Sequence, residues 1–169
     1  MPAHVLHARH NPPTVADKTA IHSSDVTLAA AAVMVAVQVL LTALIPSYEP
    51  SPSLEGVNEA LGLSLAAFAA TGGTLWYLGL VWPGETVSVG WALERAGCWL
   101  TAGAWGAYAT VVAIAYPEAT ISWSIPAVLA LGALARSIVV WRIEQHVRPA
   151  AARARSIRER ISTGEQEAI

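Results

Sequence analysis

Three charged residues lie in or beside long apolar stretches of this chain, and their types and positions could do chemistry. Glu94 and Arg95 open one stretch, and Arg136 lies near the end of the next. If the two stretches form an antiparallel hairpin of helices, Glu94 and Arg136 fall at about the same level. Three uses are open to them: an ion pair that locks the hairpin, separate contacts with the membrane surface, or a path for protons or ions. We expect the ion pair. A path for protons or ions is the least expected use, because no second acidic residue lies deep in any apolar stretch.

Histidines near the amino terminus have a spacing that could serve a metal site. His4, His7 and His10 are three residues apart, which would place imidazoles on one face of a helix. The neighbouring Pro12-Pro13 and the lack of apolar residues favour a flexible arm instead, so we expect no metal. The apolar stretches contain no histidine, which excludes a haem held between helices by paired histidines.

Catalytic motifs are missing from the sequence. There is no HExxH, phosphate-binding loop, nucleophile elbow or dinucleotide fingerprint. The serines and threonines of the apolar stretches have no histidine or lysine beside them that could act as a base. The single cysteine, Cys98, excludes an internal disulfide and a CxxC site. We therefore predict a protein that is not an enzyme and that carries no cofactor.

The elements that must position the three charges are apolar helices. Hydrophobic residues make up 54% of the chain and charged residues 13%, about half the charged share of a typical soluble domain. The apolar residues come in blocks long enough to cross a hydrocarbon core of about 30 Å. We predict an all-α integral membrane bundle of four transmembrane helices, at about residues 26–45, 60–82, 96–116 and 125–141, with a short turn around Tyr116-Pro117-Glu118 before the last.

Polar segments flank this transmembrane domain of residues 26–142. Residues 1–25 are expected to be a largely disordered arm. They are not expected to belong to a cleaved signal, because such a signal would have a short basic lead and a shorter apolar core. Ser24 or Asp25 could cap the first helix. Residues 143–169 form a basic tail that we expect to continue as a helix, with Pro149 as a point where the helix kinks or restarts.

The distribution of lysine and arginine predicts the orientation in the membrane. The loop at 46–59 and the turn at 117–124 contain neither residue, whereas the loop at 83–95 contains Arg95 and the last 28 positions contain six of the ten basic residues. Basic residues favour the cytoplasmic side. Both termini are therefore predicted to be cytoplasmic.

Small residues spaced four apart indicate where helix backbones approach closely in lipid. This pattern predicts helix packing, including association of several copies of the chain, at Gly62, Ala66, Ala69, Gly73, Ala102, Gly103, Gly106 and Ala107. Gln38 is the one strongly polar residue of the first span. We expect its side chain to form a hydrogen bond to a neighbouring helix, with pore lining as the alternative.

The basic tail is expected to contact anionic lipid headgroups, at about 1 kcal/mol for each arginine near the surface. The residues concerned are Arg142, Arg148, Arg153, Arg155, Arg158 and Arg160. Docking of a protein partner is the alternative. Nucleic acid is not expected, because no aromatic residue is interleaved with the arginines to stack on bases.

Several short segments resemble the small four-span membrane proteins encoded by bacteriophages and mobile elements of actinobacteria. They are Leu93-Glu94-Arg95-Ala96-Gly97, Tyr116-Pro117, Ser122-Trp123 and Trp141-Arg142-Ile143-Glu144. The resemblance covers residues 91–148 and transfers no functional residue. It implies a holin-like function, in which subunits oligomerise in the inner membrane and permeabilise it. Two other functions stay open: a non-enzymatic membrane anchor that modifies the host envelope or docks a partner through its tail, and a small channel or transporter subunit.

Overall fold

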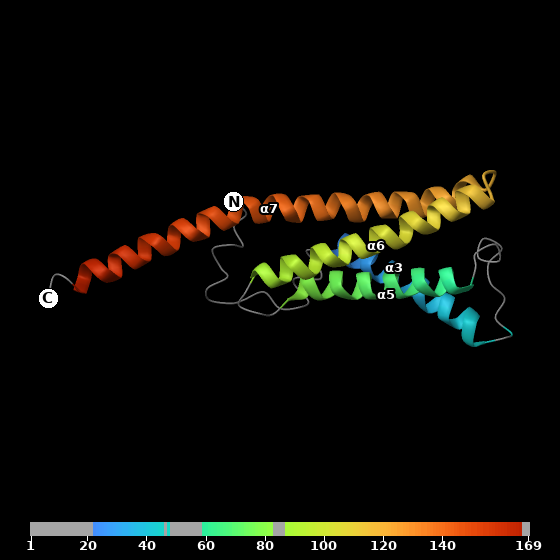
Figure 1. Cartoon of the computed structure of the whole chain (residues 1–169), viewed down its shortest axis with the longest axis horizontal. Helices are drawn as coiled ribbons and strands as arrows, with labels where there is room; N and C mark the ends of the chain where they lie inside the picture. Colours follow the sequence, from blue (N-terminus) through green and yellow to red (C-terminus); the bar gives the residue numbers. More distant parts are fainter. Residues whose placement is uncertain (1–21, 46, 48–58, 83–86, 167–169) are drawn as a thin grey trace.

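The described residues form four helices and contain no strand. The computed structural model describes residues 22–45, 47, 59–82 and 87–166, and for residues 59, 87 and 147–166 the backbone alone. The helices are α3 (Ser23–Leu44), α5 (Glu59–Val81), α6 (Val87–Ala115) and α7 (Thr120–Gln166), shown in Figure 1. Each contains an apolar segment long enough to cross a bilayer. The chain is therefore a small multi-pass membrane protein, and the predicted all-α bundle of four spans is confirmed.

The turn between α6 and α7 follows directly from its sequence. The backbone N–H of Ala119 donates to the carbonyl of Tyr116 at 3.0 Å, which closes a four-residue turn with Pro117 at its second position. Proline is favoured there because its fixed φ matches the turn. The turn is tight enough that α6 and α7 run antiparallel and in contact along their apolar length.

Two helix starts differ from the predicted ones. α6 begins at Val87, nine residues before the predicted 96, so that Glu94 and Arg95 lie inside the helix. The prediction placed the boundary at these charges, but both are paired with residues of other helices and need not mark the end of a span. α7 begins at Thr120 rather than 125, which places Pro126 in its second turn instead of its first.

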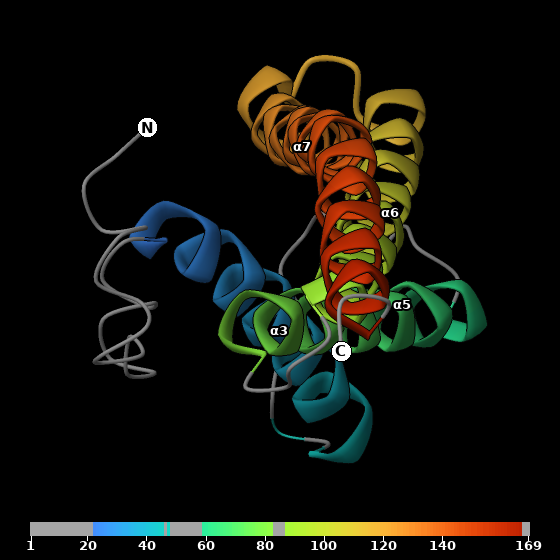
Figure 2. The same ribbon diagram turned by 90° about the vertical axis from the view of Figure 1, so that its left-hand side faces the viewer.

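Helix α6 lies at the centre of the arrangement. It contacts α5 on one side and α7 on another, while α3 packs mainly against α5. Figure 2, which looks along the bundle, shows α3 running obliquely to the other helices. The largest fully buried side chain is that of Trp76, which packs with Cys98 and Ala102 of α6 and with Ala133 of α7.

Four glycines allow α5 and α6 to come into backbone contact. Gly72 faces Gly97, and Gly79 faces Gly90, so that two pairs spaced seven residues apart meet in antiparallel register. A Cβ atom added at Gly97 would lie 2.6 Å from the carbonyl oxygen of Gly72 and against the backbone of Trp76. In lipid, where apolar burial does not drive helices together, such close packing supplies much of the association energy.

The predicted packing residues are inside the bundle on α5 but only in part on α6. Gly62, Ala66, Ala69 and Gly73 are all buried, and Gly73 meets Ala29 of α3. On α6, Ala102 is buried and Gly106 is half-buried.

Gly103 and Ala107, by contrast, are exposed and do not pack against the described helices of the same chain, so their predicted role in association between copies stays a prediction. The buried face of α6 contains Gly97, Thr101 and Trp105, and the helical period of 3.6 residues turns Gly103 and Ala107 away from that face.

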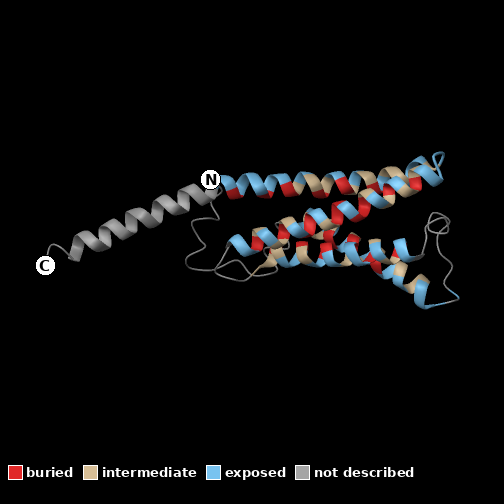
Figure 3. Ribbon diagram, in the orientation of Figure 1, coloured by how far each residue is buried: buried red, intermediate tan, exposed pale blue. Residues whose placement is uncertain are grey.

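Every helix of the bundle has exposed positions (Figure 3), and large apolar side chains occupy many of them. Large exposed side chains include Leu44 on α3, Phe68 on α5, Ile114 on α6 and Leu131 on α7. In water this surface would be a severe aggregation hazard, whereas in lipid it is the expected covering of a membrane bundle.

Candidate functional site: a charged cluster joining three helices

A charged cluster joins three of the four helices. Arg136 of α7 donates from Nε to Oε1 of Glu94 on α6 at 2.6 Å, and its Nη1 lies 3.3 Å from Oδ2 of Asp25 on α3. His22, just before α3, places Nδ1 3.6 Å from the same Asp25 oxygen. One guanidinium therefore bridges two carboxylates from different helices. The contact between Glu94 and Arg136 is the one that the sequence predicts.

Asp25 is the member of the cluster that the sequence did not assign to it. The helix already begins at Ser23 and has no side-chain cap, so neither Ser24 nor Asp25 caps it. Asp25 lies in the first turn and faces Arg136 instead. The signal that could have found it is topological: with the predicted orientation, the start of the first span lies at the same membrane side as Glu94 and Arg136.

A second ion pair fastens the α6–α7 hairpin closer to its open end. Arg95 donates from Nη1 to Oε2 of Glu144 at 2.7 Å, and the Glu144 side chain is only 6% exposed. Glu144 is eight residues beyond Arg136, about 12 Å along the helix. The hairpin is thus held at two levels, by two pairs in which each helix contributes one acid and one arginine.

The charges of the cluster around Arg136 are largely buried and therefore depend on one another. The side chains of Glu94, Asp25 and Arg136 are 6%, 14% and 21% exposed. Ionised groups shielded from water need an opposite charge and hydrogen bonds to offset the loss of hydration. When ionised, the two carboxylates and the one arginine sum to −1, and the imidazole of His22 lies beside Asp25.

A recess of about 320 Å³ opens beside this cluster. Trp82 and Trp91 form part of its wall, and Gly79 and Gly90 leave it room. Its polar wall comes from His22 and from Glu94 and Arg136, which already bind each other. The arrangement suits water or a small polar ligand. Within the described residues, no three histidine, cysteine or acidic side chains are grouped to hold a metal ion.

Cys98 lies one helical turn from Glu94 and is fully buried against Trp76. Because a thiol packed in apolar surroundings is inert and inaccessible, Cys98 is expected to resist maleimide in the folded protein and to react fully after unfolding in SDS. A mass shift on gels measures both. Ser88→Cys in a Cys98→Ala background is the matched control, since Ser88 is exposed near the start of α6 and should react in the folded state. Rapid labelling of native Cys98 would contradict the described α5–α6 contact.

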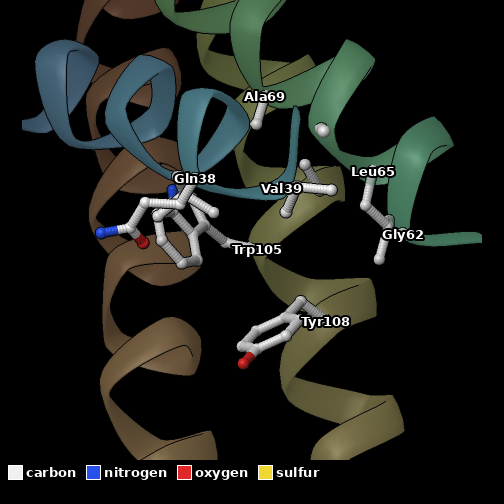
Figure 4. A pocket seen from close by; sticks show the side chains of 10 residues that line it. Gln38, Val39, Gly62, Leu65, Ala69, Trp105 and Tyr108 are labelled. Carbon is white, nitrogen blue, oxygen red and sulfur yellow. The ribbon is translucent and has the colours of Figure 1, made fainter. Parts of the chain in front are cut away.

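A second, apolar cavity of about 140 Å³ lies between α3, α5 and α6. Figure 4 shows Gln38 at its edge, with Trp105 and Tyr108 on the facing helix α6. The two rings meet edge to face at 6.4 Å. Gln38 itself is exposed, and its side chain forms no hydrogen bond with any other described residue, so the expected bond to a neighbouring helix of the same chain is absent. The outward position also gives it no pore to line within one chain.

The remaining site residues of the sequence prediction fall mostly outside the described side chains. Arg142 is exposed on α7. The side chains of the later tail residues are not described, namely those of Arg148, Arg153, Arg155, Arg158 and Arg160. The amino-terminal arm, with His4, His7 and His10, lies outside the described residues.

Comparisons with known proteins provide no further guide to function. No protein-family model, no curated protein and no solved structure matches the chain. What the molecule does must therefore be argued from its own geometry: an ion-paired membrane bundle whose last helix continues far beyond its apolar segment.

Proposed function

We propose that this protein is a non-enzymatic membrane anchor that presents a basic helix to an acidic partner protein in the cytoplasm. One observation carries the proposal. α7 runs without interruption from Thr120 to Gln166, although its apolar segment ends at His146. Figure 1 shows its last part projecting well past the ends of α5 and α6, after a change of direction. Pro149 lies in this region of the sequence and accounts for a bend without breaking the helix.

Geometry favours a protein partner over the lipid surface that the sequence alone suggested. Arg153 and Arg160 are seven and fourteen residues beyond His146, about 10 and 21 Å along a helix. At physiological salt, electrostatic attraction fades over about 8 Å. Although α7 changes direction here, its last part projects past the ends of α5 and α6 (Figure 1), so most of its arginines lie about 10 Å or more along the helix from the end of the apolar segment at His146. Residues 147–166 contain five arginines and two glutamates, a net charge of +3.

The holin-like function implied by the resemblance is the second candidate. The observation in its favour is the exposed pair Gly103 and Ala107, a close-packing surface on α6 that none of the described helices covers. Against it, the charges of Glu94, Arg95 and Arg136 within the spans are paired with charges of neighbouring helices. A water-filled lesion would need polar groups free to face it.

The test places a photo-crosslinking amino acid at Ile157 in the full-length protein in living bacteria, and follows membrane potential in the same culture. We expect one discrete protein adduct, unchanged potential, and loss of the adduct when the four arginines from Arg153 to Arg160 become glutamine. The matched control replaces the same arginines with lysine, which keeps the charge and should keep most of the adduct. Crosslinking to lipid alone would refute the proposal, and abrupt depolarisation would favour the holin-like function.

A further inference from the structure

Helix α3 is the least covered of the four. Only 17% of its most apolar segment is buried in the chain, against 28% to 39% for the other three helices. Its outward face is continuous along the helix and consists of Thr27, Ala30, Met34, Val37 and Gln38. These positions recur with the three- and four-residue steps that place side chains on one side of a helix.

Gln38 is the residue on this face whose side chain is costly to expose to lipid without a hydrogen-bond partner. It lies twelve residues after Val26 and seven before Ile45, about 18 and 10 Å from the two ends of the apolar stretch. A glutamine side chain is too short to reach the headgroups over such distances. The described part of the chain offers its amide no hydrogen-bond partner, and hydrocarbon offers none either.

We propose that α3 is the interface of a homodimer in which the Gln38 amides of two copies bind each other. A primary amide is self-complementary, because it has both a donor NH₂ and an acceptor oxygen. A two-fold arrangement brings the same residue of each copy together, so one contact satisfies both glutamines. Ala30 allows the backbones to approach on one side of Gln38, and Met34 is flexible enough to fill the remaining space.

This inference does not depend on the anchoring role of α7, although a dimer would present two basic helices. It also differs from association through Gly103 and Ala107, which are on another helix. The apolar cavity beside Gln38 has room for part of a lipid chain, but an acyl chain cannot bond to the amide.

The experiment measures self-association of the full chain in neutral lipid vesicles by energy transfer between labelled copies. Gln38→Leu is expected to raise the dissociation constant of the dimer about 3- to 30-fold, as for other polar contacts between membrane helices. Thr110→Leu is the matched control. Thr110 is also polar and exposed, but its hydroxyl donates to Gly106 of its own helix at 2.8 Å, so its loss should leave association unchanged.

A cysteine scan identifies the interface independently of any loss of folding. In a Cys98→Ala background, cysteines at Ala30, Met34 and Gln38 should form disulfides between copies, whereas cysteine at the buried Ala32 should not. A monomeric wild-type protein, or association that is unaffected by Gln38→Leu, would overturn the proposal. So would crosslinks confined to the α6 face at Gly103.

Discussion

Gly97→Ala is expected to lower the free energy of unfolding by about 2–3 kcal/mol, and Gly97→Leu to prevent the bundle from assembling. The added Cβ would lie against the backbone of Trp76 and 2.6 Å from the Gly72 carbonyl oxygen. Backbone atoms cannot rotate aside as a flexible side chain can, so the only relief is to move α5 and α6 apart. That separation weakens the contacts of Trp76 and Cys98 along the crossing. Unfolding in mixed micelles with increasing SDS measures the loss.

The matched control is Gly103→Ala on the same helix. No atom lies within 4 Å of the Cβ that this substitution adds. Alanine is also the better helix former by about 1 kcal/mol. The control is therefore expected to leave stability unchanged or to raise it slightly. Equal effects of the two substitutions would show that α5 and α6 do not meet at Gly97.

Sequence reasoning succeeded where a single physical length decides the outcome. An apolar run must be about 20 residues long to cross a membrane, so the four spans could be counted directly. The turn at Tyr116–Ala119 could be located because proline restricts the backbone there. The start of α6 could not be located in the same way. Glu94 and Arg95 have the composition of a span boundary, and only the partners supplied by α7 allow both charges to lie within the helix.

The helix contacts were harder to predict because small residues occur on every face of these helices. A spacing of four selected Gly103 and Ala107, which are exposed, and passed over Gly72, Gly79, Gly90 and Gly97. The informative pattern was the spacing of seven residues between the two glycines of α5 and between the two glycines of α6. This equal spacing lets the two helices meet at both levels in antiparallel register. Glycine, unlike alanine, was the discriminating residue, because backbone contact leaves no room for a Cβ atom.

The charged cluster was only half predictable, for a geometric reason. A short turn fixes the relative levels of Glu94 and Arg136, since both lie on one hairpin. Asp25 reaches the cluster only because α3 crosses α5 at the angle set by Gly73 against Ala29. The predicted topology places the start of α3 on the same membrane side as Glu94 and Arg136, but no local pattern in the sequence encodes the crossing that brings Asp25 to Arg136.

Arg136→Met is expected to destabilise the bundle by about 3–5 kcal/mol, the cost of removing one partner of a buried ion pair. The two carboxylates of Asp25 and Glu94 would remain largely shielded from water, at 14% and 6% exposure, without the guanidinium that bridges them. Methionine is close to arginine in length and flexibility, so packing changes little. The loss should appear as a lower midpoint in the same SDS titration at neutral pH.

Neutralising the carboxylates as well separates charge from packing. In the triple variant Asp25→Asn, Glu94→Gln and Arg136→Met, no unpaired charge remains, and replacement of a whole buried charge network is often neutral. We expect most of the stability to return. If the triple variant is as unstable as Arg136→Met alone, the guanidinium acts through its shape and hydrogen bonds rather than through its charge.

The substitutions Glu94→Gln and Asp25→Asn, each combined separately with Arg136→Met, then rank the contacts of Arg136. Glu94 is the more buried partner and binds at 2.6 Å, against 3.3 Å for Asp25. A double-mutant cycle between Arg136→Met and Glu94→Gln should therefore give the larger coupling energy. The cycle with Asp25→Asn should give a smaller coupling energy, because Arg136 is not the sole partner of that carboxylate and His22 also contacts it. The opposite order would mean that Arg136 serves chiefly to fix α3, with the hairpin held by Arg95 and Glu144.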